Sequence, residues 1–203
     1  EAGTVAEVSK RLQAAVQSEE VETYLTGTEL VIEDFVQSTQ EGIQKTELIA
    51  VVFILVVLVL VFRSPLIPLV SLATVGVSYL VSLGIVAQLV EHFDFPFSNF
   101  TQVFLVVVLF GIGTDYNILL YNRFRAELGE TGDVLEAVRR TFQTAGRTVV
   151  YSGLAVFIGF LALYLAEFKI YRAASAVAIG VAVMILVLYT LNPFFMGLLG
   201  KAL

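Results

Sequence analysis

The chain has 203 residues, of which 58% are hydrophobic and 15% are charged, a composition outside the range of ordinary soluble domains that indicates a membrane protein. It has no cysteine and a single histidine, which excludes disulfides, thiol nucleophiles and a histidine metal cluster, so we expect no metal and no cofactor. The net charge of −6 argues against a nucleic-acid partner, because phosphate binding needs clustered Lys and Arg.

The first 45 residues have the pattern of a soluble segment. Residues 5–16 have apolar side chains at helical spacing, residues 21–25 form a short strand candidate, and residues 30–45 have helical periodicity again. This segment lacks the apolar content of a full domain, and nothing before residue 47 resembles a signal peptide. We therefore expect residues 1–45 to be a short α/β remnant, the C-terminal end of an outer domain, within an internal piece of a longer chain.

Residues 46–203 are predicted to form an all-α transmembrane bundle of five helices. The apolar runs cover residues 47–62, 66–90, 100–121, 149–166 and 173–191, and the last one continues through Asn192 and Pro193 toward Leu199. An odd number of spans places the two chain ends on opposite sides of the membrane.

The orientation follows from the Lys and Arg residues close to span ends. One side carries Arg63, Arg123, Arg125, Arg139, Arg140, Arg147 and Lys201, whereas the other side carries Lys45, Lys169 and Arg172. We therefore predict a multi-pass protein of the cell membrane whose loop 123–147 and C-terminus are cytoplasmic and whose N-terminal segment is extracytoplasmic.

The predicted cytoplasmic loop contains a helix signal. Asp133 is placed as an N-cap with Glu136 three residues later, and an apolar stripe follows on one side, formed by Val134, Leu135, Val138 and Phe142. Arg139 and Arg140 lie off that stripe. Two arrangements remain open: a helix lying flat on the membrane with its cations near lipid headgroups, or a loop helix packed against the spans.

Asp115 is the one acidic residue within the apolar run 100–121. Ionising it in hydrocarbon would cost at least roughly 2.5–3.5 kcal/mol at mid-depth. Ending the helix before it does not remove this cost, because residues 100–113 are too few for a span of about 20 residues. A carboxyl at this depth is neutral, paired or in contact with water, and a group that changes among these states can carry protons.

Helical spacing places Gly111, Leu119 and Asn122 on the same face as Asp115, with Gly113 close beside it. Small residues let a neighbouring helix approach closely, which predicts a packing role for both glycines. Hydrogen-bond partners in this chain are expected at the inner end of the fourth span, from Thr148 and Ser152. The alternative is that Asp115 stays protonated as a hydrogen-bonded packing residue between helices.

The segment GIGTDYNILLYNRFRAEL, residues 111–128, resembles the mycobacterial-membrane-protein-large transporters of the resistance-nodulation-division superfamily. Glycine, an Asp-Tyr pair and a following Arg-x-Arg-x-Glu segment resemble the fourth span of that family, matched here by Gly111, Asp115, Tyr116, Arg123, Arg125 and Glu127. Residues 145–163 look like its fifth span and residues 21–90 like the end of a porter domain running into spans two and three, so the resemblance covers nearly the whole chain.

The resemblance implies one half of a proton-driven exporter of lipids or other hydrophobic molecules. Asp115 would be the proton-binding carboxyl and Tyr116 its hydrogen-bonding companion, reaching across to a second half or another copy. Ser152, Thr148 and Asn122 are candidate neighbours in the relay, and Arg123 and Arg125 would anchor the cytoplasmic end. The implied partners are membrane lipids, protons, a hydrophobic substrate and the second half; the sequence names no substrate.

Two other functions share parts of this pattern. An intramembrane aspartyl protease needs two carboxyls that share a proton, and the chain has no second acid within a span, so we predict that it is not an enzyme. A non-transporting sterol-sensing or scaffold membrane domain would share the span layout and would not need a titrating aspartate. The effect of Asp115→Asn on export distinguishes this alternative from a transporter.

Overall fold

The computed structural model divides the chain into two units, Glu1–Ile49 and Ala50–Leu203. It describes residues 66–200 continuously, although the side chains of Asn99 and Leu199 are not described. It also describes residues 51–57 and 59–60 and scattered positions before residue 50. Every regular element among these described residues is helical, and none is a strand. The α/β character predicted for residues 1–45 is therefore not supported. The predicted strand at 21–25 lies outside the described residues, as do most of the helices predicted at 5–16 and 30–45.

Four stretches of the described chain are long and apolar enough to cross a membrane, at Leu66–Phe93, Phe100–Thr131, Val134–Leu165 and Lys169–Leu198. The helices within them are α3 (Leu66–Phe93), α4 (Asn99–Thr131), α5 (Val134–Thr141), the π-helix η1 (Phe142–Gly146), α6 (Arg147–Ala162), the 3₁₀-helix η2 (Leu163–Leu165), α7 (Lys169–Ala174) and α8 (Ala176–Leu199). The predicted span at 47–62 lies partly outside the described residues. Within it, residues 51–57 and 59–60 are described and helical.

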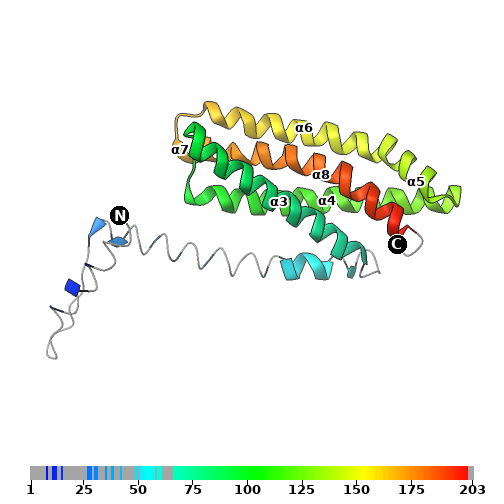
Figure 1. Cartoon of the computed structure of the whole chain (residues 1–203), viewed down its shortest axis with the longest axis horizontal. Helices are drawn as coiled ribbons and strands as arrows, with labels where there is room; N and C mark the ends of the chain where they lie inside the picture. Colours follow the sequence, from blue (N-terminus) through cyan, green and yellow to red (C-terminus); the bar gives the residue numbers. More distant parts are fainter. Residues whose placement is uncertain are drawn as a thin grey trace. The chain divides into compact units, whose positions relative to one another are not determined.

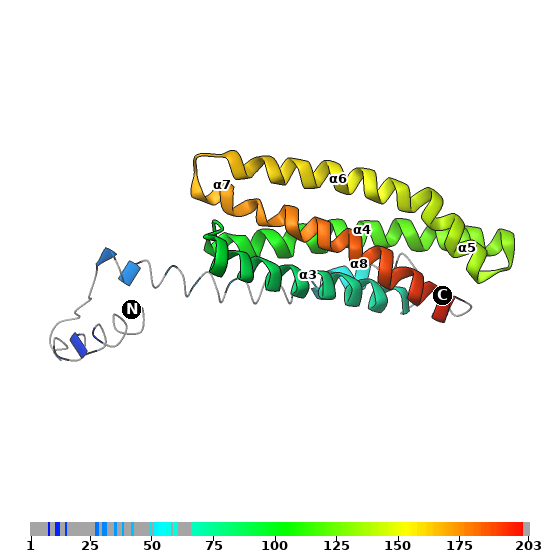
Figure 2. The ribbon, with the colours of Figure 1, turned by 45° about the horizontal axis from the view of Figure 1, so that its top comes forward.

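The four long helices α3, α4, α6 and α8 run side by side in the second unit, with α5 at one end and α7 at the other (Figures 1 and 2). Helix α8 contacts α3, α4 and α6, and α3 also packs against α4. Fully buried side chains such as Leu109, Val181, Met184 and Leu188 fill the space between these helices. Helix α8 is thus the central helix, whereas α6 leaves most of its surface exposed.

Glycine allows the closest helix contacts in this bundle. A Cβ on Gly113 of α4 would lie 2.7 Å from Val75 of α3 and 2.8 Å from Met184 of α8. A Cβ on Gly153 of α6 would lie 2.6 Å from Ile185 of α8. Any larger residue at these positions would force the helices apart, which is the physical reason for small residues where spans pack.

The predicted loop 123–147 is corrected by the structure. Helix α4 continues to Thr131, α5 follows as the second arm of a helical hairpin, and η1 joins α5 directly to α6, so only Gly132 and Asp133 interrupt the helices in this region. The Asp133 side chain caps α5 by accepting the Glu136 N–H at 2.9 Å, as predicted. Polar side chains follow Tyr121, but Arg and Glu are good helix formers, so the helix continues beyond the apolar run.

Helix α5 packs against the spans, so the second of the two predicted arrangements applies. It contacts α4 and α8, and Ala137 and Thr141 are buried in that contact. Leu135 is 81% exposed, so its place in the predicted apolar stripe was wrong. The packed side of α5 lies over Ala137, whereas Leu135 points away from it.

Candidate functional site

Asp115 lies well inside the span formed by α4. The helix begins with a capping box, in which Phe100 N–H donates to the Ser98 hydroxyl at 3.3 Å and Ser98 N–H donates to the Thr101 hydroxyl at 3.0 Å. Asp115 lies about 24 Å along the helix axis from Asn99, where α4 begins, at about 1.5 Å per residue. The hydrocarbon core is about 30 Å thick, so a helix that enters it at its first residue carries this carboxyl past the middle of the bilayer but not out of it.

The carboxyl of Asp115 lies on a face of α4 that no other part of the described chain covers. Gly111, Leu119 and Asn122 are exposed together with Asp115, and Val107, two turns earlier, is 62% exposed. We call these five residues the open face of α4. A Cβ on Gly111 would meet no described atom within 4 Å. The shared face of Gly111, Asp115, Leu119 and Asn122 agrees with the prediction from helical spacing.

Tyr116 points into the bundle instead. Its side chain is 8% exposed, and its hydroxyl lies 3.1 Å from the hydroxyl of Ser152 on α6. The Ser152 hydroxyl also lies 2.8 Å from the Thr148 carbonyl, so Tyr116, Ser152 and Thr148 form one hydrogen-bonded series. Adjacent residues on a helix lie about 100° apart, which directs Tyr116 away from the open face. Within the described chain Tyr116 thus contacts Ser152, and its reach toward a second half stays a prediction.

Gly113 and Gly111, both predicted to aid packing, have different surroundings. Gly113 is buried in the contact of α4 with α3 and α8, whereas Gly111 has no neighbour on the open face within the described residues. Of the two glycines, only Gly113 therefore packs against helices of the described chain. A packing role for Gly111 requires something outside the described residues.

A buried polar contact joins three spans and was not predicted from the sequence. The side-chain amide of Asn192 on α8 donates to the Asn117 side-chain oxygen on α4 at 2.8 Å, and the Thr74 hydroxyl of α3 lies 3.4 Å from the Asn192 side-chain oxygen. All three side chains are fully buried. We call Thr74, Asn117 and Asn192 the polar core. Two asparagines within apolar runs were the available signal, but their pairing across 75 residues of sequence could not be predicted from spacing.

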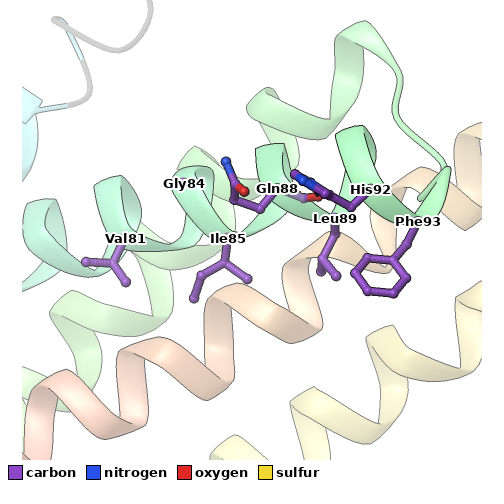
Figure 3. Close-up of a pocket in the computed structure, with 7 residues that line it drawn as sticks. All are labelled: Val81, Gly84, Ile85, Gln88, Leu89, His92 and Phe93. Carbon is purple, nitrogen blue, oxygen red and sulfur yellow. Dashed lines mark hydrogen bonds between the residues drawn. The ribbon is translucent and has the colours of Figure 1, made fainter.

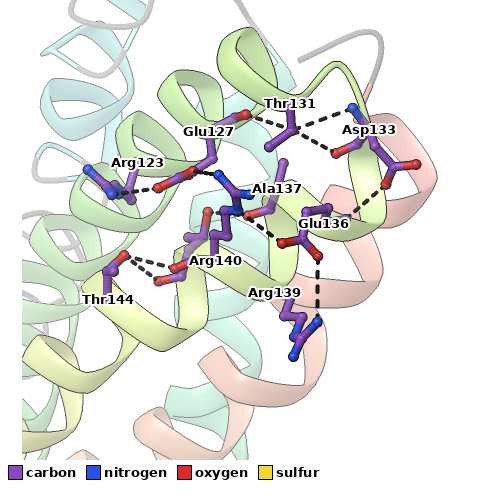
Figure 4. Close-up of polar contacts among 10 residues, drawn as sticks. Arg123, Glu127, Thr131, Asp133, Glu136, Ala137, Arg139, Arg140 and Thr144 are labelled. Atoms are coloured by element: carbon purple, nitrogen blue, oxygen red, sulfur yellow. Dashed lines mark hydrogen bonds and ion pairs between the residues drawn. The ribbon is translucent and has the colours of Figure 1, made fainter.

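Charged side chains pair where α4 and α5 meet (Figure 4). The Glu127 carboxylate, whose side chain is 5% exposed, binds Arg123 at 2.5 Å and Arg140 at 3.8 Å. Arg140 also binds Glu136 at 2.9 Å. Of the predicted basic anchors, Arg123 is thus paired within the chain, and Arg125 is half-buried. Glu127 was noted only as part of a motif, and its burial depends on the packing of α5, which the sequence left open.

An open groove lies along the C-terminal half of α3 (Figure 3). The described residues that line it are Val81, Gly84, Ile85, Gln88, Leu89, His92 and Phe93. Its lining is mostly apolar, and His92, the single histidine, approaches the Gln88 carbonyl of its own helix at 3.0 Å. Within the described part of the chain, no group of three or more His, Cys, Asp or Glu residues could hold a metal ion.

These residues define one arrangement that can exchange protons. Asp115 supplies an acid at membrane depth on an uncovered face, and Tyr116 supplies a buried hydroxyl paired with Ser152 one position further along the helix. A hydroxyl both donates and accepts hydrogen bonds, so the Tyr116–Ser152 pair can reverse its direction without moving either helix.

Comparisons with known proteins agree with this membrane architecture. The model of the MMPL family matches residues 1–203. YdgH of Bacillus subtilis, named as a membrane protein, is 48% identical over 185 residues, which are 91% of this chain and 21% of that protein. MmpL12 of Mycobacterium tuberculosis, named as a probable transport protein, is 27% identical over 197 residues, 96% of this chain and 17% of that protein. The chain thus spans about a fifth of the length of such relatives. With a family match over its whole length and four described helices able to cross a membrane, the chain is a multi-pass membrane protein and belongs to the MMPL family.

Proposed function

We propose that the chain is part of a transporter that uses the proton-motive force to export lipids or other hydrophobic molecules across the cell membrane, with Asp115 as the proton-binding group. The observation that carries the proposal is the placement of this carboxyl on the open face of α4, within an apolar span. No helix of the described chain buries this carboxyl, so it does not act as a packing residue among these helices. The relatives named as transport proteins support the general role.

The proton step follows from the cost of charge in hydrocarbon. An ionised Asp115 at this depth needs water or a partner, whereas its neutral form is compatible with an apolar contact. Protonation from the outer side therefore changes what the open face can pack against. A membrane potential of 100 mV contributes about 2.3 kcal/mol per elementary charge, which is enough to shift a two-state equilibrium of the spans.

Tyr116 and its partners form the second part of the proposed relay. The hydroxyl series from Tyr116 through Ser152 to the Thr148 carbonyl starts beside Asp115 along α4. It links α4 to α6, so a change at the carboxyl that rotates α4 would also strain this hydrogen bond. Asn122, two turns from Asp115 on the open face, is the remaining polar neighbour on the cytoplasmic side.

A second half of the transporter, or another copy, is the proposed cover of the open face. Gly111 leaves space for a helix to approach Asp115 closely, since a Cβ there would meet nothing within 4 Å of the described chain. Because the chain spans 21% of the length of YdgH, there is room in such relatives for further spans. In this proposal the chain contributes one half of the intramembrane machinery.

The proposed orientation places the α4–α5 hairpin in the cytoplasm. Arg123, Arg125, Arg139, Arg140 and Arg147 lie in or next to this hairpin, whereas Lys169 and Arg172 lie at α7, at the opposite end of the bundle (Figures 1 and 2). The excess of cations at the hairpin end indicates the cytoplasmic side. The N-terminal segment is then extracytoplasmic, and the basic residues of the hairpin anchor this end of the bundle.

The test is proton counterflow and export by the full-length protein in proteoliposomes. Asp115→Asn is expected to abolish both while the protein remains inserted, because the amide cannot titrate. Asp133→Asn is the matched control: it makes the same chemical change at an exposed helix cap, and asparagine also caps helices well, so activity should be retained. Equal counterflow in wild type and Asp115→Asn would reject the relay. Export that survives Asp115→Asn would favour the non-transporting sterol-sensing-like or scaffold alternative for this segment.

A further inference from the structure

Two fully buried hydroxyl groups lack a hydrogen-bond partner in the described part of the chain. They belong to Ser71 of α3 and Tyr121 of α4. The other buried hydroxyls of α3, on Thr74, Ser78 and Ser82, each donate to the carbonyl four residues earlier. Ser71 is therefore the exception on its own helix. Buried polar groups in native proteins are almost always paired with protein or with ordered water, so both hydroxyls need a partner.

The packing of α3 against α4 places Ser71 and Tyr121 within about one turn of the level of the polar core. Val75 and Gly113 face each other, since a Cβ on Gly113 would lie 2.7 Å from Val75. The two helices run in opposite directions (Figures 1 and 2). Ser71 lies one turn from Val75 and Asn117 one turn from Gly113, both toward the α4–α5 hairpin, so Ser71 and Asn117 are at the same level. Tyr121 follows Asn117 by one more turn in the same direction.

Helix α8 contains a proline directly after Asn192 of the polar core. Pro193 follows Asn192 inside α8 and has no N–H, so the carbonyl of Tyr189 lacks its usual intrahelical donor. Around this level, the Ser71 and Tyr121 hydroxyls and the amides of the polar core provide both donors and acceptors. All of these groups are neutral, so a bound cation would find no counter-charge among them.

We propose that the polar core is a buried water-binding site, in which ordered water connects the Ser71 and Tyr121 hydroxyls with the network of Thr74, Asn192 and Asn117. A buried water makes two to four hydrogen bonds, and the groups named here can provide that number. The site joins α3, α4 and α8 on the side of α4 opposite the open face. It is independent of any proton relay at Asp115, and its test needs no transport assay.

Radiolytic footprinting of the full-length protein in lipid nanodiscs tests the site directly. X-rays generate hydroxyl radicals from bound water inside the protein, and these oxidise adjacent aromatic rings. We expect Tyr121 to be oxidised several-fold faster than Phe124, a fully buried aromatic residue nearly one turn away on the same helix. Equal rates for the two residues would overturn the proposal.

Asn192→Leu should remove the site, because it deletes the amide that joins the three helices. The oxidation rate of Tyr121 should then fall toward that of Phe124. Thr190→Val is the matched control, since Thr190 is exposed on the same helix and bonds only carbonyls of its own helix. The proposal is wrong if Tyr121 is oxidised as fast in Asn192→Leu as in wild type.

Tyr121→Phe gives an independent result if Asn192→Leu does not fold. Removal of a water-bound hydroxyl should lower the midpoint of thermal unfolding by about 2–4 °C. Removal of a dry, unpaired hydroxyl would raise the midpoint instead, which would contradict the proposal. Replacing Na⁺ by choline should leave the midpoint unchanged. A Na⁺-dependent midpoint that disappears in Tyr121→Phe would assign the site to a cation and also overturn the proposal.

Discussion

Gly113→Ala should weaken the bundle at the point where three spans meet. The new methyl group would lie 2.7 Å from a Val75 methyl carbon and 2.8 Å from the Met184 sulfur. Met184 can change rotamer, whereas Val75 is fully buried and stiff at χ1, so the backbone of α3 or α4 has to shift. Overpacking of this kind costs about 1–3 kcal/mol.

Gly159→Ala on α6 is the matched control, because a Cβ there would meet no described atom within 4 Å. Both changes gain the same helix propensity, so their difference isolates the packing cost. At about 2–4 °C per kcal/mol for a unit of 150–250 residues, the thermal midpoint of Gly113→Ala should lie about 2–12 °C below that of Gly159→Ala. Val75→Ala combined with Gly113→Ala should recover part of the loss. Equal midpoints for the two single variants would refute the close approach of α3 and α4 at Gly113.

Three further outcomes follow from the described contacts. Glu127→Gln should lower stability by about 1–2 kcal/mol in thermal or chemical unfolding, since two half-exposed arginines lose a buried counter-charge; no change would contradict that role. Gly146→Ala should lower the thermal midpoint, because its Cβ would lie 2.9 Å from the Tyr189 hydroxyl. Adding Tyr189→Phe should recover part of the loss; no recovery would show that this contact is not the cause. Tyr116→Phe and Ser152→Ala remove the same hydrogen bond, so the double variant should have the same proton counterflow as the single variant with the lower counterflow. Additive losses would show that the two hydroxyls act separately.

Local patterns were sufficient for much of the fold. Apolar runs located the four spans of the described chain, and Asp133 followed by Glu136 located the start of α5. Helical spacing also placed Gly111, Leu119 and Asn122 on the face of Asp115. These features depend on residues within one or two turns of each other, where the geometry of the helix alone decides their placement.

Features that depend on contacts between distant segments could not be predicted in the same way. The pairing of Asn117 with Asn192 needs the register of α4 against α8, and the burial of Glu127 needs the packing of α5. The contact of Tyr116 with Ser152 depends in the same way on the register of α4 against α6. The continuation of α4 to Thr131 was missed because a charged segment was read as a loop.

The central claim is that Asp115 changes its protonation state inside the membrane. Isotope-edited infrared difference spectroscopy of the full-length protein in lipid, recorded between two pH values, measures this directly. The account predicts a protonated-carboxyl band that responds to pH in wild type, is absent in Asp115→Asn, and persists in Asp133→Asn. A spectrum in which Asp115→Asn removes no pH-dependent carboxyl band would contradict the account.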